Sequence, residues 1–178
     1  LVYFPLNISL LFLYVGTIID LKELLKRFRM QIYGFALVEV QFESLMVFKP
    51  SLSKRIPLDA LFDILDNDHD GRVDGLEFLG GLALICQGTF EDKARFCFEL
   101  FDFNLNSTLS KKEMIVMLMS SINGMNMLSG GNEEDELDLE SFEKIADEAF
   151  GKADRDRSGS VSYEEFVAWA RSNRVIMA

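Results

Sequence analysis

The sequence predicts an all-α fold in which four helix–loop–helix units pair into two lobes. Three observations favour this fold. An acidic twelve-residue pattern occurs three times, beginning at Asp66, Asp102 and Asp154. Apolar residues at three- and four-residue spacing flank each copy, as in amphipathic helices. Because a repeated unit of this kind buries its apolar face only against a neighbour, three visible units imply a fourth.

The first loop, DNDHDGRVDGLE at 66–77, concentrates negative charge that a bound cation would offset. Calcium takes roughly six to eight oxygen ligands, and a twelve-residue loop supplies them from positions 1, 3, 5, 7, 9 and 12, with glycine at position 6. Gly71 occupies position 6, and Val73 is the apolar residue at position 8. The candidate ligands are Asp66, Asp68, Asp70, the backbone carbonyl of Arg72, Asp74 (directly or through water) and the bidentate Glu77.

The other two loops repeat this layout with fewer charges. In DRDRSGSVSYEE at 154–165, with Gly159 and Val161 at positions 6 and 8, the candidate ligands are Asp154, Asp156, Ser158, the carbonyl of Ser160, Ser162 and Glu165. In DFNLNSTLSKKE at 102–113, with Leu109 at position 8, they are Asp102, Asn104, Asn106, the carbonyl of Thr108, Ser110 and Glu113.

The three loops differ in expected affinity. Carboxylates number five in 66–77, three in 154–165 and two in 102–113, and more ligand charge generally tightens calcium binding until repulsion opposes it. Ser107 stands at position 6 of 102–113, where a positive φ costs a non-glycine residue about 1 kcal/mol. We therefore expect calcium at 66–77 and 154–165, with Mg²⁺ as an alternative occupant at rest. The loop at 102–113 is either a weak site or a loop kept for its shape.

The fourth unit is expected upstream, within residues 20–48. Helical spacing runs through Asp20–Arg29 and again through Val40–Phe48, but the intervening MQIYGFALVEVQ offers almost no oxygen ligands. This unit is interpreted as degenerate, pairing structurally with the next one and binding no metal. The predicted division is an apolar segment at 1–19, a first pair at 20–88 with its functional unit at 58–86, and a second pair at 89–178. The acidic SGGNEEDELDLE at 129–140 is interpreted as a solvated connection.

Composition narrows the class of partner and the compartment. A net charge of −11 disfavours nucleic acid and anionic lipid, and suits a metal cation or a basic peptide. Cys86 and Cys97 lie in apolar helical sequence without C-x-x-C spacing, which indicates a reducing, intracellular compartment without a disulfide framework or zinc site. Residues 1–19 carry no charge and approach the roughly 20 apolar residues that span a bilayer. A membrane anchor and an internal or target-bound apolar helix both remain open for that segment.

The sequence carries no recognisable catalytic set. His69 is the sole histidine, and it occupies position 4 of the first loop, which faces away from a bound ion. It is therefore interpreted as a solvated spacer. Without another histidine, neither cysteine has a base to activate it, and no glycine-rich phosphate loop or Ser-His-Asp set is present. We expect no catalytic residue, no organic cofactor and no enzyme.

Together, the three loops resemble the EF-hand superfamily, which implies paired EF-hands in two lobes. The helix that leaves the first loop, EFLGGLALICQGTFEDKARFCFELFD at 77–102, is similar to the branch that contains neuronal calcium sensors, calcineurin B-like proteins and calaxin-like ciliary sensors. The matching positions are Glu77, Phe78, Gly88, Thr89, Glu91, Lys93, Phe98, Phe101 and Asp102. A silent first hand and a long connection before the last hand are also similar to that branch. The resemblance covers about residues 20–172 and implies a cytoplasmic protein, with the cilium or flagellar axoneme and a membrane surface as candidate locations.

A sensor function is the leading hypothesis. In sensor EF-hands the position-12 glutamate enters the loop when calcium binds, and the exiting helix swings to open an apolar groove. Glu77 and Glu165 would then be the levers. Five methionines suit either a groove for an amphipathic helix or ordinary core filling, namely Met114, Met117, Met119, Met125 and Met127. We expect a calcium sensor that regulates a protein partner. A constitutive structural subunit of a larger assembly and a calcium buffer are the alternatives.

Overall fold

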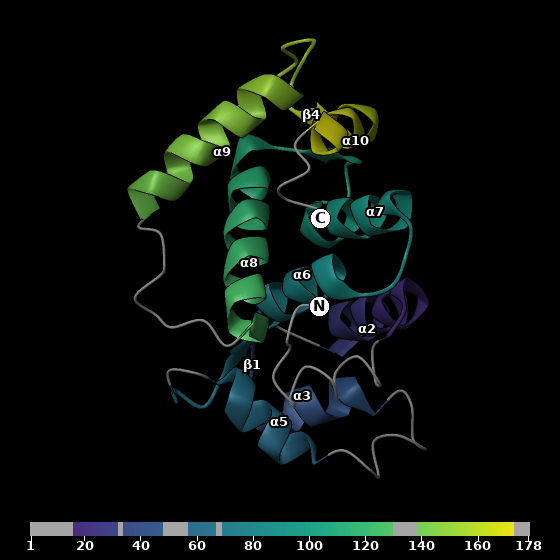
Figure 1. The fold of residues 1–178 in the computed structure, drawn as a ribbon, viewed down its shortest axis with the longest axis vertical. Coiled ribbons are helices and arrows are strands. Elements are labelled where there is room, and N and C mark those ends of the chain that lie inside the picture. The colour runs from purple at the N-terminus through teal and green to yellow at the C-terminus, as the bar shows by residue number, and fades with distance from the viewer. Residues whose placement is uncertain (1–15, 32–33, 48–56, 67–68, 130–138, 173–178) are drawn as a thin grey trace.

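The structure, a computed structural model, describes residues 16–31, 34–47, 57–66, 69–129 and 139–172. In these residues helices dominate and each strand is only two residues long, which confirms the predicted all-α class (Figure 1). In chain order the elements are α2 (Ile18–Gln31), β1 (Ala36–Leu37), α3 (Glu39–Met46), α5 (Leu58–Leu65), β2 (Val73–Asp74), α6 (Gly75–Ile85), α7 (Phe90–Phe101), β3 (Thr108–Leu109), α8 (Lys111–Ser129), α9 (Leu139–Ala153), β4 (Val161–Ser162) and α10 (Tyr163–Ser172).

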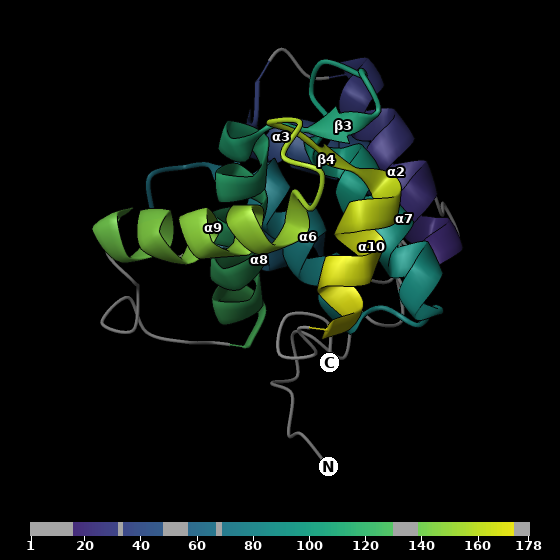
Figure 2. The ribbon, with the colours of Figure 1, turned by 90° about the horizontal axis from the view of Figure 1, so that it is seen from above.

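Short antiparallel strand pairs join the units two by two. β1 pairs with β2, with Leu37 opposite Val73, and β3 pairs with β4, with Leu109 opposite Val161. Figure 2 shows β3 and β4 side by side. All four of these side chains are at most 1% exposed. The predicted pairing of the degenerate first unit with the unit at 58–86 is confirmed, and the apolar residue at position 8 forms the contact in each functional loop.

The apolar residues predicted from helical spacing form the core of each lobe. In the first lobe Phe42 packs edge-on against Phe62 and Phe78, with ring centroids 5.7 and 5.4 Å away. In the second, Phe166 packs against Phe98 and Trp169 at 5.8 and 6.0 Å. All six residues are at most 4% exposed. The burial of these aromatic rings accounts for much of the driving force for folding.

The segment at 77–102 is not one continuous helix, which corrects the expectation from the sequence. α6 ends at Ile85, and Cys86 is extended, with φ −64° and ψ 157°. Thr89 then begins α7, because its hydroxyl accepts the Asp92 N–H at 3.1 Å. The backbone N–H of Ile18, at the start of α2, donates to the Gln87 carbonyl at 2.9 Å. The break between the two helices is therefore tied to the first helix of the fold.

α6 and α8 cross with their backbones in direct contact (Figure 1). A Cβ atom added to Gly124 would lie 1.9 Å from the carbonyl oxygen of Glu77, and one added to Gly81 would lie 2.6 Å from the Gly124 carbonyl. Only glycine fits both positions without a shift of the backbone. Because α6 belongs to the first pair of units and α8 to the second, this crossing is a principal contact between the two lobes.

Candidate calcium sites

The three loops share a backbone framework that begins at the aspartate of position 1. Its two carboxylate oxygens accept the backbone N–H groups of positions 5 and 6 at 2.9–3.1 Å in every loop. Positions 4 and 6 have left-handed backbone conformations, with φ between 56° and 85°, at His69, Gly71, Leu105, Ser107, Arg157 and Gly159. The turn folds each loop around the side chain of its first aspartate, and it brings the expected positive φ to Ser107.

The loop at 154–165 gathers three carboxylates. One oxygen from each of Asp154, Asp156 and Glu165 lies within 4.8 Å of the others, a spacing that suits one shared cation. Glu165 Oε2 accepts the Ser162 N–H at 2.9 Å and the Ser162 hydroxyl at 2.7 Å. These donors lower the pKa of Glu165, so the side chain keeps its negative charge as the pH falls through the usual glutamate range. The donor set fits a hard divalent ion.

Other predicted ligands of the 154–165 loop lie beside this cluster. The Ser158 hydroxyl donates to the Ser160 carbonyl at 2.9 Å, which brings these two predicted ligands together. Glu165 Oε1 accepts the backbone N–H groups of Arg155 and Asp156 at 3.0 and 3.4 Å. The position-12 glutamate is therefore held inside its own loop by donors from both sides.

The loop at 102–113 closes in a similar way around Glu113, which is 6% exposed. Glu113 Oε2 accepts the Ser110 N–H and hydroxyl at 2.8 and 2.7 Å, and Oε1 accepts the Phe103 N–H at 3.1 Å. Asn104 turns its amide N–H toward Glu113 at 3.3 Å, while its oxygen accepts the Asn106 N–H at 3.0 Å. Asn104 thus directs a donor into the loop, which agrees with the expectation of a weak site without testing it.

The loop at 66–77 differs at position 12. Glu77 Oε1 accepts a hydrogen bond from Asn123 Nδ2 of α8 at 3.0 Å. Asp74 acts as the N-cap of α6, accepting the N–H groups of Leu76 and Glu77 at 2.7 and 3.0 Å. Among the described residues, the acidic side chains of this loop form no cluster of three like that of 154–165. Asp68, a predicted ligand, lies outside the described residues.

Asn123 is the site-associated residue that sequence reasoning missed. It lies 46 positions after Glu77, in a helix interior, and no local motif marks it. Only the crossing of α6 and α8 brings the two side chains together. The ligand assignments in all three loops, including the Arg72 and Thr108 carbonyls, stay predictions.

The other residues considered from sequence occupy ordinary positions. His69 is exposed, as a solvated spacer would be. Cys86 and Cys97 are buried free thiols, and burial raises the pKa of Cys97 to about 12, so its thiol stays protonated. Met114 and Met117 are at most 3% exposed, which favours core filling for these two of the five methionines. Residues 1–15 and 130–138 lie outside the described residues, with the alternatives for the apolar segment and most of the acidic connection.

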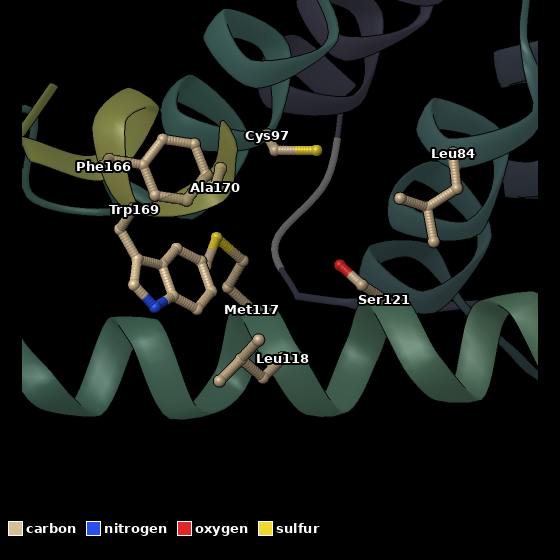
Figure 3. A pocket seen from close by; sticks show the side chains of 8 residues that line it. All are labelled: Leu84, Cys97, Met117, Leu118, Ser121, Phe166, Trp169 and Ala170. Carbon is tan, nitrogen blue, oxygen red and sulfur yellow. The ribbon is translucent and has the colours of Figure 1, made fainter. Parts of the chain in front are cut away.

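A small cavity separates α6 from the core of the second lobe (Figure 3). Its volume is about 10 Å³, and Leu84 of α6 faces Trp169 of α10 and Met117 of α8 across it. The remaining lining residues are Cys97, Leu118, Ser121, Phe166 and Ala170. A cavity of this size holds about one water at most, so α6 closes the apolar face of the second lobe here.

A larger cavity, of about 480 Å³, lies near the loops at the junction of the two lobes. Phe28 and Phe35 come from the first lobe and Phe103 from the second. The rings of Phe35 and Phe103 lie 5.3 Å apart, and these side chains are 46% and 41% exposed. Exposed aromatic side chains beside a cavity form a candidate partner-binding surface.

Ser107→Gly is expected to raise the free energy of unfolding by roughly 0.5–1 kcal/mol, because glycine avoids the penalty of a left-handed φ and loses part of that gain to chain entropy. The φ of Ser107 is 64°. Urea denaturation followed by circular dichroism measures the change. Ser107→Ala retains the Cβ atom and is the matched control, with no comparable gain expected. An equal gain for alanine would show that the hydroxyl group, and not φ, sets the penalty.

Comparison with known proteins agrees with this geometry. A family model described as an EF-hand domain pair matches residues 91–171, and one described as EF hand matches residues 58–80. A recoverin family protein of Dictyostelium discoideum is 35% identical over 128 residues, covering 67% of this chain and 57% of the relative. Human calaxin is 32% identical over 120 residues, covering 67% and 54%. Guanylyl cyclase-activating protein 2 of Lithobates pipiens is 24% identical over 158 residues, covering 89% and 80%.

Helix–loop–helix units that pair through position 8 and carry oxygen-rich twelve-residue loops define an EF-hand protein, and the chain belongs to the EF-hand superfamily. Its relatives place it in the branch of neuronal calcium sensors and calcineurin B-like proteins. The chain spans just over half the length of the recoverin family protein and of human calaxin. The matching family is a calcium-binding family, and the chain is not an enzyme. Among the described helices, none combines the length and apolar content needed to cross a membrane.

Proposed function

We propose that the chain is a calcium sensor that regulates a protein partner. The observation that carries the proposal is the convergence of Asp154, Asp156 and Glu165 within 4.8 Å, in a loop whose backbone is already folded around its first aspartate. The proposed ligands of this loop are completed by Ser158, the Ser160 carbonyl and Ser162. In the 66–77 loop they are Asp66, Asp68, Asp70, the Arg72 carbonyl, Asp74 and Glu77. Bound calcium supplies the positive charge that offsets carboxylate repulsion.

The proposed response to calcium begins at the position-12 glutamates. Glu77 lies in the first turn of α6, and Glu165 lies in the first turn of α10. Entry of a carboxylate into its loop would turn the helix that carries it. α6 carries Leu84 over the cavity beside Trp169. Movement of α6 would therefore uncover apolar surface of the second lobe.

An amphipathic helix with basic residues is the proposed partner. The net charge of −11 attracts cationic segments, and the exposed rings of Phe35 and Phe103 offer apolar contact. The similarity to human calaxin and the free thiols support an intracellular site of action, which we propose to be the cytoplasm, with the cilium or flagellar axoneme as its specific location. We also propose a division into pairs at 20–88 and 89–178, since the break between α6 and α7 falls there.

Calorimetric calcium titration tests the ligand assignment. The wild-type chain is expected to show two main binding events. Glu77→Gln and Glu165→Gln are each expected to lose the event of their own loop, because a neutral amide replaces a bidentate carboxylate. Glu164→Gln changes an exposed neighbour outside the proposed ligand set and should keep both events. If both position-12 variants titrate like the wild type, the ligand assignment is wrong.

Dye binding in the same samples tests the sensor mechanism. The fluorescence of a hydrophobic dye is expected to rise with calcium and to return with chelator, because a sensor exposes apolar surface on binding. Unchanged fluorescence with calcium bound would instead identify a buffer. Equal co-purification of a partner in calcium and in chelator would identify a constitutive structural subunit.

A further inference from the structure

Glu77 is the one position-12 glutamate among the three loops that bonds to the opposite lobe in the described structure. Asn123 Nδ2 of α8 donates to Glu77 Oε1 at 3.0 Å. At the corresponding place, Glu113 and Glu165 each accept both the N–H and the hydroxyl of the serine at position 9 of their own loop. The difference therefore lies in what each loop offers its glutamate.

Position 9 explains why the 66–77 loop holds its glutamate less well. Ser110 and Ser162 occupy position 9 in the other loops and donate hydroxyl hydrogens to a carboxylate. In 66–77 this position is Asp74, which at neutral pH has only acceptor oxygens and a negative charge. Asp74 and Glu77 repel each other unless a cation lies between them. An amide donor outside the loop, such as that of Asn123, gives Glu77 a favourable alternative partner.

The surroundings of Asn123 indicate that its orientation is set by this contact. Its Oδ1 atom is buried and accepts no hydrogen bond from the described residues. A buried amide oxygen without a partner is unfavourable, so the bond between Nδ2 and Glu77 is the polar contact that accounts for the side chain's position. The next residue, Gly124, lets the α8 backbone approach the Glu77 carbonyl, and this close approach brings the two side chains within reach.

We propose that Asn123 is a positioning residue that holds Glu77 on α8, so that calcium binding to the 66–77 loop must break the bond between the two lobes. This inference rests on the ligand role of Glu77 in the proposed function. Asn123 lowers the calcium affinity of the 66–77 loop and couples that loop to the crossing of α6 and α8. The same crossing carries Leu84 over Trp169, so release of Glu77 reaches the core of the second lobe.

Calorimetric titration of Asn123→Ala in a Glu165→Gln background tests the proposal, with the Glu165→Gln parent for comparison. The variant is expected to bind calcium at 66–77 about tenfold more tightly, because one hydrogen bond to a charged group no longer has to be broken. Alanine has the highest helix propensity, so α8 should be retained. Asn126→Ala, three residues further along α8, is the matched control and should leave this affinity unchanged.

Two further measurements make the result independent of any one variant. Asn123→Asp keeps the side-chain shape but sets a carboxylate against Glu77, and it should also tighten calcium binding. In the wild-type chain, the NMR resonance of the Asn123 side-chain amide, assigned by its loss in Asn123→Ala, should move on calcium addition with the midpoint of 66–77 binding. In Glu77→Gln it should stay in place over the same calcium range.

The outcomes separate this inference from the proposed function. Calcium binding at 66–77 with equal affinity in the parent, Asn123→Ala and Asn123→Asp would overturn the role of Asn123 and leave the sensor proposal intact. An Asn123 amide resonance that does not move while the loop fills would do the same. No calcium binding at 66–77 in any of these proteins would overturn the ligand assignment itself, and the inference with it.

Discussion

Phe42→Ala is expected to lower the free energy of unfolding by about 3–5 kcal/mol. The Phe42 side chain is completely buried and contacts Phe62 and Phe78 of the neighbouring unit edge-on. Alanine would remove the ring and leave a cavity between the degenerate unit and the functional one, because the surrounding helices relax only partly. Urea denaturation followed by circular dichroism, in chelator so that calcium binding does not contribute, measures the loss.

Val40→Ala is the matched control for Phe42. It lies in the same helix, α3, and is 73% exposed, so its truncation should change the free energy of unfolding by no more than about 0.5 kcal/mol. Similar values for the two variants would contradict the placement of α3 against α5 and α6. Because the degenerate unit completes the first lobe, Phe42→Ala is also expected to weaken calcium binding at the 66–77 loop.

Gly124→Ala is expected to lower the free energy of unfolding by about 3 kcal/mol, the upper part of the range for an overpacked core. The added Cβ atom would lie 1.9 Å from the Glu77 carbonyl oxygen and 2.9 Å from the Gly81 nitrogen. Both are backbone atoms, so α6 and α8 must separate to make room. The same urea denaturation experiment measures the change.

Gly151→Ala supplies the matched control for this overpacking. Gly151 lies in α9, and nothing lies within 4 Å of a Cβ atom added there. Alanine should therefore raise the free energy of unfolding by roughly 0.5–1 kcal/mol, since it is the better helix former. Opposite signs for the same substitution in two helices would establish that contact with α6, and not helix propensity, sets the cost at Gly124. A stabilised Gly124→Ala would contradict direct backbone contact between the helices.

Local patterns were enough to predict much of the fold and of the candidate sites. The twelve-residue spacing located three loops, and Val73, Leu109 and Val161 at position 8 predicted the strand contacts. Helical spacing also located the degenerate unit at 20–48, whose helices are α2 and α3. These features follow from interactions between residues close in the chain, such as the hydrogen bonds of Asp66 to positions 5 and 6 of its loop. A single sequence carries that information directly.

Tertiary packing decided the features that join the two lobes. The contact of Asn123 with Glu77 depends on where α8 crosses α6, and that crossing depends on Gly81 and Gly124 together. The break after Ile85 depends on backbone pairing with the start of α2. Residue spacing defines the faces of one helix but not the place where a distant helix lies across it. That place follows from shape complementarity between whole surfaces, which requires the folded chain.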